Sequence, residues 1–228
     1  MVYRLPKKFV GFPDAEEADE NGLVAVGGSL SVEHLVNAYA LGLFPWYIDH
    51  RGSPYWYSPD PRMVLFPDQF RCSKSLRRVM RSGRYEVRID THFADVMCGC
   101  ATTSRVGQGG TWITPEYADA YGELHRLGLA HSFETYHEGV LVGGLYGVSL
   151  GRMFFGESMF HTMTDASKVA FARLVEVCLR LQFCLIDAQQ ENSHLASLGA
   201  RPISRKEYLR QLRCNDLRLT LQKEWTDL

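Results

Sequence analysis

The sequence lacks an unbroken apolar segment long enough to form a membrane helix. Its most apolar internal stretch, GVLVGGLYGVSLG, is interrupted by glycines and falls well short of the ~20 residues that a bilayer-spanning helix requires. The first twenty residues contain two prolines and an acidic run, a pattern that fits neither a secretory signal nor a transit peptide. We therefore expect a cytoplasmic protein whose cysteines are reduced thiols.

An excess of charge of either sign is also missing. The 25 basic residues are balanced by 26 acidic residues, so a histone-like binder is excluded and any nucleic-acid contact must use a local basic patch. The six cysteines include one Cys-x-Cys pair, Cys98 and Cys100, but no Cys/His pairs at zinc-binding spacing. We expect neither a metal site nor a cofactor.

Signatures of several common enzyme classes are absent. The glycine cluster SRVGQGG at 104–110 matches neither the phosphate loop G-x-x-x-x-G-K-[ST] nor the dinucleotide loop G-x-G-x-x-G. It also departs from the acyl-CoA pyrophosphate loop [RQ]-x-x-G-x-[GA], because Gln108 occupies a glycine position. A connector is the favoured interpretation, with an anion-binding loop as the alternative. No G-x-S-x-G or H-E-x-x-H motif is present, so hydrolysis and covalent catalysis gain no support.

Helix and turn signals divide the chain into two parts. Residues 1–62 are rich in Gly, Pro and aromatic residues, with one expected helix that begins after the N-cap Ser31 and ends at Gly42. Residues 44–62 combine Pro and Gly with large aromatic side chains, and we expect a loop that holds these rings outside a core. The pattern predicts a small N-terminal lobe over 1–62 and a main domain over 63–228.

The order of elements in the main domain indicates an α+β fold. Three strands within 131–160 are separated by tight turns, which favours an antiparallel meander. Further strands are expected at 84–90 and 183–188. Helices are expected at about 73–81, 115–127 and 165–181, and after a capping box that begins at Ser204. This order predicts a mostly antiparallel sheet flanked by helices, as in the C-terminal half of acetyltransferase-like (GNAT-like) folds.

A basic stripe runs along the helix expected at 73–81. Lys74, Arg77, Arg78 and Arg81 recur at helical spacing and therefore share one face. Like charges at this spacing repel one another, so their presence favours the interpretation that the stripe binds the phosphates of a polyanion. A face that is only solvated is the alternative.

Three polar residues are embedded in apolar strands: Glu157 in MFFGESMF, and Asp187 and Gln189 in CLIDAQQ. Strand alternation places Asp187 and Gln189 on one face, with Ala188 opposite. A buried carboxylate is unfavourable unless it is paired or used in chemistry, so each acid needs a partner. A hydrogen-bond network with a purely structural role is the alternative.

Three tryptophans lie beside Pro or Gly in expected loops. Trp46, Trp56 and Trp112 are placed where a nucleic-acid base or an apolar substrate could stack on them. Packing in the core between the two lobes is an equally good interpretation, because buried aromatic rings usually belong to a core.

Several of these motifs occur together in one known family. GLFPWY, YWYSPDPR, GTWIT, LVGGLYGV, FFGESMF and LIDAQQENSHLASLGA, in this order, resemble the leucyl/phenylalanyl-tRNA–protein transferase family over about residues 11–212. The resemblance implies a small N-terminal domain and an acetyltransferase-like domain that does not use acetyl-CoA. It also implies transfer of Leu or Phe, and less well Met, from aminoacyl-tRNA to the N-terminal amine of proteins that begin with Arg or Lys. The product would be an N-terminal degradation signal.

The same resemblance assigns roles to individual residues. Trp46 and Trp112 match the tryptophans that enclose the terminal adenosine of the tRNA, and the basic helix matches that of the family. Glu157 and Gln189 match polar groups near the aminoacyl ester, and Asp187 matches the acid that orients Gln189. The apolar pocket for the aminoacyl side chain would be lined by Leu145, Phe154 and Met159.

Physical chemistry then indicates what such a site must supply. An aminoacyl ester is already activated, and a protein α-amine with a pKa of about 7.7–8.0 is partly neutral at pH 7. Positioning is therefore worth more than strong base catalysis. We expect Gln189 to accept a hydrogen bond from the amine, while Asp187 fixes Gln189 and is available to take the proton. A CoA-dependent N-acetyltransferase and a noncatalytic tRNA-binding module are the competing classes. Without coiled-coil heptads, we expect a monomer.

Overall fold

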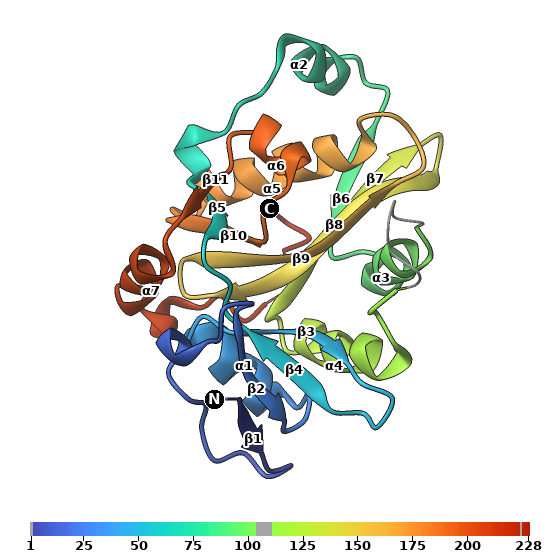
Figure 1. Cartoon of the computed structure of the whole chain (residues 1–228). Coiled ribbons are helices and arrows are strands. Elements are labelled where there is room, and N and C mark those ends of the chain that lie inside the picture. Colours follow the sequence, from blue (N-terminus) through green and yellow to red (C-terminus); the bar gives the residue numbers. More distant parts are fainter. Residues whose placement is uncertain (1, 104–110, 224) are drawn as a thin grey trace.

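The computed structural model describes residues 2–103, 111–223 and 225–228, and these form two β-sheets (Figure 1). The glycine cluster at 104–110, which we expected to be a connector, lies outside the described residues. A four-stranded sheet has the order β1-β2-β4-β3. Its strands are β1 (Tyr3–Leu5), β2 (Leu23–Gly27), β3 (Phe44–Ile48) and β4 (Pro54–Tyr57).

The larger sheet has seven strands in the order β11-β5-β10-β9-β8-β7-β6. These are β5 (Arg62–Leu65), β6 (Glu86–Ile89), β7 (Ala130–His137), β8 (Val140–Leu150), β9 (Met153–His161), β10 (Leu185–Gln189) and β11 (Arg201–Ile203). Strands β7, β8 and β9 form the expected antiparallel meander, and the pair β9–β10 is parallel. The other neighbouring pairs of this sheet are antiparallel. The predicted α+β class with a mostly antiparallel sheet is confirmed.

The helices begin where the sequence places their caps. Ser31, Ser73, Thr114 and Ser204 each accept a hydrogen bond from a backbone N–H of the first turn. The helices are α1 (Val32–Ala40), α2 (Lys74–Arg81), α3 (Phe93–Thr102), α4 (Pro115–Arg126), α5 (Ala166–Arg180), α6 (Ser193–Ser197) and α7 (Arg205–Arg213). Helices α3 and α6 were not expected, because glycine and threonine weaken the helical signal of the first and the second is very short.

The expectation of a loop over residues 44–62 is wrong. This segment contains β3 and β4, which pair as an antiparallel hairpin. Pro45 lies where the register shifts and Pro54 opens its strand, and both are positions at which a sheet tolerates proline. The rings pair across the hairpin, as in the stacking of Tyr47 on Tyr55 with centroids 4.5 Å apart. The ring of Trp56 is fully buried, so it belongs to the core.

The core lies on both faces of the larger sheet. One cluster contains rings from α1, α4 and the small sheet, such as Tyr39, Tyr121 and Trp56, and it therefore joins the two sheets. The other cluster contains the apolar side of α5 together with Leu145 and Phe154. Figure 1 shows the small sheet at one end of the molecule and α2 at the other. Among the described helices, none is both long enough and apolar enough to cross a membrane.

Candidate active site

A cavity of about 460 Å³ opens where β9 and β10 stop pairing. Their parallel pairing runs from Leu185 opposite Met153 to Asp187 opposite Phe155. Beyond this point both strands contribute to the wall of the cavity, Glu157 from β9 and Gln189 from β10. The two parallel strands thus separate and leave a cavity between them, and the polar residues predicted from the sequence line this cavity.

A β-bulge on each strand aims these two side chains. In β9, Tyr146 pairs with Ser158 and Gly147 with Gly156, which leaves Glu157 as the extra residue. In β10, the register against β5 shifts between Asp187 and Gln189, and Gln189 has a positive φ of 62°. Bulges interrupt the two-residue alternation and redirect side chains.

The expected alternation in β10 agrees with the packing of its side chains. Asp187 bonds to Tyr208 of one core cluster, and Gln189 bonds to Glu157, whose tyrosine partners belong to the same cluster. Ala188 packs against the other cluster, on the α5 side of the sheet. The cavity is lined by residues of both clusters, so all three residues border it.

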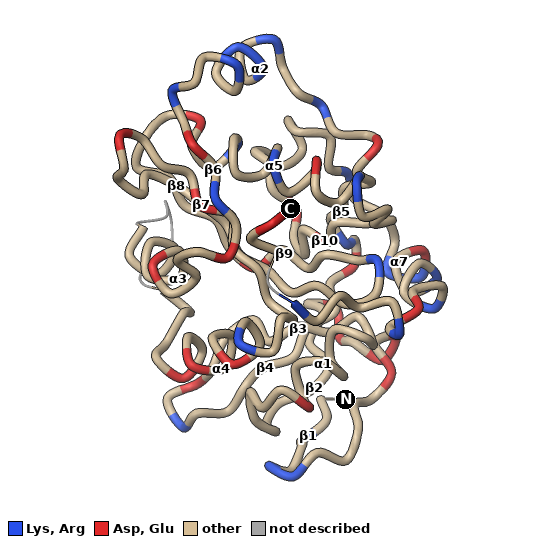
Figure 2. Tube along the Cα trace, turned by 180° about the vertical axis from the view of Figure 1, so that it is seen from behind, with Lys and Arg blue, Asp and Glu red and all other residues tan. Residues whose placement is uncertain are grey.

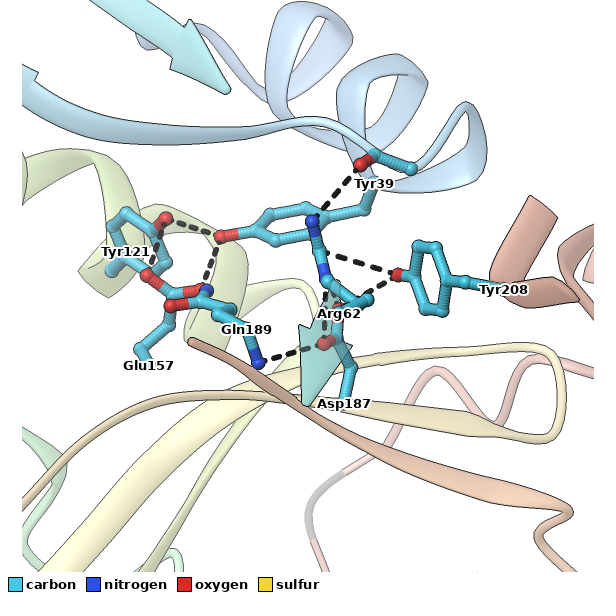
Figure 3. A network of polar contacts seen from close by, with 8 residues as sticks. Tyr39, Arg62, Tyr121, Glu157, Asp187, Gln189 and Tyr208 are labelled. Atoms are coloured by element: carbon cyan, nitrogen blue, oxygen red, sulfur yellow. Dashed lines mark hydrogen bonds and ion pairs between the residues drawn. The ribbon is translucent and has the colours of Figure 1, made fainter. Parts of the chain in front are cut away.

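The carboxylate of Asp187 is fully buried and pairs with Arg62 of β5 (Figure 3). Its Oδ1 accepts from Arg62 Nε at 2.9 Å and from the backbone N–H of Gln189 at 2.8 Å. Its Oδ2 accepts from Arg62 Nη2 at 2.6 Å and from the Tyr208 hydroxyl at 2.7 Å. Each oxygen thus accepts two hydrogen bonds, so Asp187 has no remaining acceptor position with which to take a proton.

The guanidinium of Arg62 makes further contacts besides its ion pair with Asp187. It lies over the rings of Phe44 and Tyr208, at 4.8 and 4.5 Å from their centroids, and Nη1 donates to the carbonyl of Gly42. Burial alone would lower the pKa of Arg62, but the charge of Asp187 raises it above its ordinary value. The guanidinium is therefore a permanent charge that ties β5 to β10 and to the end of α1.

Glu157 forms a second polar group beside the first (Figure 3). Its Oε1 accepts from the Tyr39 hydroxyl and from Gln189 Nε2, each at 2.7 Å, and its Oε2 accepts from the Tyr121 hydroxyl at 3.1 Å. Burial raises the pKa of Glu157 to about 7, although the hydrogen bonds from the two tyrosines act in the opposite direction. Both protonation states of this carboxyl are therefore populated near neutral pH.

The tyrosines around Glu157 form a continuous hydroxyl cluster. The hydroxyls of Tyr39 and Tyr121 are hydrogen-bonded to each other, and Tyr121 also reaches Tyr117 at 3.4 Å. Tyr117 donates to the carbonyl of Pro45 and stacks on Tyr121. Burial raises the pKa of all three phenols well above its ordinary value, so they remain hydrogen-bond donors. The cluster connects α1, α4 and β3 to the carboxylate.

Gln189 is held between the two acids. The Asp187 carboxylate binds its backbone N–H, and Glu157 binds its side-chain Nε2. Asp187 therefore positions Gln189 through the main chain, and Glu157 orients the amide. Among the described residues, none donates a hydrogen bond to Gln189 Oε1, and this half-buried side chain lines the cavity. The amide oxygen is available to accept from a bound molecule.

Two half-buried tryptophans line the cavity. Trp46 lies in β3, not in a loop, and its ring packs against Tyr57 with centroids 4.8 Å apart. Trp112 lies three residues before the start of α4, and its carbonyl accepts from the backbone N–H of the N-cap residue Thr114. Trp56 does not line the cavity, and its indole N–H donates to the carbonyl of Gly27 at 2.8 Å. The structure thus brings together Trp46 and Trp112 and leaves Trp56 in the core.

The apolar part of the cavity contains all three residues expected for the side-chain pocket, Leu145, Phe154 and Met159. Phe171 and Leu174 of α5 and Ile186 of β10 complete this wall. Sequence reasoning missed these additional residues because their pattern is that of ordinary core positions. A cavity with an apolar wall and a few convergent polar groups is typical of a ligand site.

The basic stripe lies elsewhere. The exposed side chains of Lys74, Arg77, Arg78 and Arg81 on α2 surround a shallow depression of their own and do not line the cavity. Within the described part of the chain, none of the four forms an ion pair with a carboxylate. Figure 2 shows these charges gathered at the end of the molecule that α2 occupies. They are free to contact an anion in solvent.

Sequence reasoning also missed the partners of the acids. Arg62, Tyr39, Tyr121 and Tyr208 come from four separate elements, and none was singled out. Arg62 could have been found, because it is a cation at the start of the apolar run RMVLF and a buried Asp187 requires one. Among the described residues, no group of three or more His, Cys, Asp or Glu side chains could hold a metal ion.

Comparisons with known proteins agree with the motifs. A family model described as leucyl/phenylalanyl-tRNA protein transferase matches residues 64–213, and the model of its N-terminal domain matches residues 28–60. A leucyl/phenylalanyl-tRNA–protein transferase of Dechloromonas aromatica (strain RCB) is 56% identical over 203 residues, 88% of this chain and 86% of the relative. A protein of the same name from Anaeromyxobacter sp. (strain Fw109-5) is 54% identical over 98% of this chain and 94% of its own length.

Similar solved structures are more distant. A GCN5-related N-acetyltransferase from Kribbella flavida shares 10% identity with a TM-score of 0.39, and covers 64% of this chain and 55% of its own. A tandem GNAT protein from the clavulanic acid biosynthesis pathway shares 13% identity with a TM-score of 0.37, and covers 79% and 61%. The sequence relatives are far closer than these structures.

Proposed function

The chain belongs to the leucyl/phenylalanyl-tRNA–protein transferase family and is an aminoacyltransferase, and on this premise we propose how its cavity works. The cavity receives the aminoacylated 3′ end of Leu- or Phe-tRNA, and less readily that of Met-tRNA. The aminoacyl group passes to the N-terminal amine of a protein that begins with Arg or Lys. The extended N-terminus then serves as a degradation signal in the cytoplasm.

The observation that carries this proposal is the position of Gln189. Its amide is oriented by Glu157, its backbone is held by Asp187, and its Oε1 is available beside an apolar and aromatic cavity. A neutral amine needs a hydrogen-bond acceptor that aims its lone pair without trapping it as a cation, and an amide oxygen meets this requirement. Gln189 therefore positions the incoming amine against the ester carbonyl.

Proton transfer is assigned to Glu157 instead of Asp187. The amine nitrogen attacks the ester carbonyl, the new C–N bond forms, and the bond to the ribose oxygen breaks. The amine loses one proton and the ribose oxygen gains one. Asp187 has no remaining acceptor position, whereas Glu157 Oε2 accepts only one described hydrogen bond and its pKa is about 7. A pKa near the working pH suits a group that first accepts and then returns a proton.

Positioning supplies most of the acceleration. About 10–15% of an α-amine is neutral at pH 7, so obtaining the reactive form costs only about 1 kcal/mol. Holding the amine and the ester in reactive geometry can contribute about 7–11 kcal/mol. The rigid setting of Gln189 by two buried hydrogen-bond networks supports this assignment.

Three parts of the donor are recognised. Trp46 and Trp112 enclose the terminal adenosine, since a base stacked on an aromatic ring gains about 1–3 kcal/mol. Leu145, Phe154 and Met159 receive the aminoacyl side chain, and a pocket of this kind discriminates by shape at about 1–3 kcal/mol per methylene. The basic stripe on α2 binds phosphates of the tRNA body, which its exposed and unpaired charges support.

The acceptor protein brings the positively charged side chain of its N-terminal Arg or Lys to the same cavity. Three carboxylates line it: Asp187, which is paired with Arg62, Glu157 at the bulge of β9, and Glu191 in the segment that follows β10. Glu191 is exposed, so its carboxylate is accessible to a basic side chain at the entrance. Negative charge at this position supports the preference for N-terminal Arg or Lys. The division into domains at 1–62 and 63–228 and the monomeric state stay predictions.

One assay tests the proposed function. Radiolabelled Leu-tRNA and Phe-tRNA are each offered with an Arg-initiated peptide, and labelled acetyl-CoA is offered in a parallel reaction. We expect label in the peptide from both charged tRNAs and none from acetyl-CoA. A Gln189→Ala variant serves as the control for specific transfer. Label from acetyl-CoA alone would overturn the proposal, and a peptide beginning with Ala should remain unlabelled.

A further inference from the structure

The C-terminal segment packs into the core on the α5 side of the larger sheet. The family model ends at residue 213, yet Trp225, twelve positions further on, is fully buried. Burial of a tryptophan near the end of a chain requires that the segment be held in place. Residues outside the part that matches the family model therefore contribute to the folded core.

Trp225 is anchored by its ring and by its backbone. Its ring stacks on His131 with centroids 3.7 Å apart and an interplanar angle of 12°. Its backbone N–H donates to Asp90 Oδ2 at 2.7 Å, and the same oxygen is bonded by His131 Nδ1 at 2.8 Å. The buried carboxylate of Asp90, which directly follows β6, thus joins β7 to the C-terminal segment.

The flanks of Trp225 are also fixed. The carbonyl of Leu228 accepts from Arg173 Nη2 of α5 at 2.5 Å. Before Trp225, the backbone at Lys223 approaches Gly128 so closely that a Cβ at Gly128 would lie 2.4 Å from Lys223 N. Only glycine at this position allows the segment to pass. The hydrogen bond at Leu228 and the close contact of Lys223 with Gly128 both limit how far Trp225 can move.

Phe154 links Trp225 to the cavity. The ring of Phe154 lies 6.3 Å from that of Trp225 and also lines the cavity, whereas Trp225 itself does not line it. Phe133 flanks both rings, at 6.3 Å from Phe154 and 6.4 Å from Trp225. A Cβ at Gly147 would lie 2.6 Å from the Phe154 ring, so the ring is confined from that direction as well.

We propose that Trp225 is a positioning residue that sets the size of the aminoacyl side-chain pocket by holding Phe154 in place. The inference rests on the proposed function, because it assigns the cavity to the donor side chain. Cores are packed at crystal-like density, so the loss of an indole leaves space into which neighbouring rings relax. Displacement of Phe154 toward that space enlarges the pocket and favours the larger donor side chain, Phe, over Leu.

A competition assay measures this effect. Leu-tRNA and Phe-tRNA carrying different labels are mixed in one reaction with an Arg-initiated peptide, and the product ratio reports the ratio of the two kcat/KM values. This ratio does not depend on how much of the enzyme is folded. For Trp225→Leu we expect the Phe-to-Leu ratio to rise about tenfold, the scale of one methylene in an apolar pocket. Trp225→Phe, a milder change, should shift the ratio in the same direction.

Phe183→Leu is the matched control. Phe183 contacts the same indole, with centroids 5.8 Å apart, but does not line the cavity. Its variant should lose stability and keep the ratio within about twofold. An unchanged ratio in both Trp225 variants, or an equal change in Phe183→Leu, would overturn the inference. Failure of the wild-type protein to use either charged tRNA would contradict the proposed function instead.

Discussion

The guanidinium of Arg62 and the carboxylate of Asp187 form a bidentate ion pair, with Nε–Oδ1 and Nη2–Oδ2 distances of 2.9 and 2.6 Å and side-chain exposures of 1% and 0%. The two residues lie 125 positions apart and belong to neighbouring strands of one sheet. Asp187 also accepts hydrogen bonds from the backbone N–H of Gln189 and from the hydroxyl of Tyr208. The ion pair therefore sets the position of Gln189. Loss of either charge therefore acts on catalysis through position.

The first prediction concerns Asp187→Asn. The substitution leaves a buried guanidinium unpaired, so we expect a loss of about 3–5 kcal/mol in the free energy of unfolding. We also expect a strong fall in kcat/KM with nearly unchanged affinity for tRNA, because the basic stripe is unaffected. Urea unfolding, transfer kinetics and filter binding of charged tRNA measure the three quantities.

The control for this variant is Glu86→Gln, which breaks the exposed pair with Arg88. It should leave stability and transfer almost unchanged. Equal losses of tRNA affinity and kcat/KM in Asp187→Asn would contradict the positioning role.

The second prediction concerns the pH dependence of transfer. Glu157 has a pKa of about 7 and must be ionised to accept the proton, so activity should rise with pH through that value. The acceptor amine, with a pKa of about 7.7–8.0, must also be deprotonated. Below both pKa values the logarithm of kcat/KM should rise with a slope of about two in the wild type and about one in Glu157→Gln. A slope of two in the variant would remove Glu157 from proton transfer.

The third prediction follows from the same pKa through stability. The folded-state pKa of Glu157 is raised from 4.5 to about 7, so the folded state binds more protons than the unfolded state between these values. This contribution is fully present below pH 4.5 and is lost as pH rises through 7, by up to about 3 kcal/mol. Glu157→Gln, which is neutral at every pH, should therefore gain stability relative to the wild type between pH 4.5 and pH 8. Urea unfolding at pH 4.5 and at pH 8 measures the difference in the free energy of unfolding between the variant and the wild type. A difference that is the same at both pH values would contradict the raised pKa.

The fourth prediction concerns the stacking rings. Trp46→Ala and Trp112→Ala should each raise the KM for charged tRNA about 5- to 150-fold, the equivalent of about 1–3 kcal/mol per stacked base, with a smaller effect on kcat. Steady-state kinetics over a range of Leu-tRNA concentrations provide the measurement. Tyr47→Ala is the control, because this exposed ring is on the same strand and does not line the cavity. An equal effect of Tyr47→Ala would argue against a site between the two tryptophans.

The fifth prediction tests the basic stripe. The double variant Arg77→Ala/Arg78→Ala should flatten the log–log dependence of tRNA affinity on salt by more than one unit, since each phosphate contact contributes about 0.7–0.9 to that slope. The matched control is Arg126→Ala/Arg210→Ala, which removes two arginines that are paired with Glu123 and Glu207. An unchanged slope in the Arg77/Arg78 variant would mean that the stripe is only solvated.

Much of the fold could be predicted from local patterns. Helix starts at Ser31, Ser73 and Thr114 follow from side chains that accept hydrogen bonds within their own first turn, which is a property of a few adjacent residues. The β3–β4 hairpin was missed because proline and glycine dominate its local signal, whereas its structure is decided by cross-strand ring contacts and by prolines placed at a register shift and at a strand start.

The sequence by itself determined the family, the α+β class and the residue types of the site, because motifs and periodicity are carried by neighbouring positions. Only the tertiary structure decided how these residues work. The pairing of Arg62 with Asp187, the bulges that aim Glu157 and Gln189, and the support of Phe154 by Trp225 all join distant segments. They depend on strand register and on packing between layers, which no single stretch of the sequence specifies.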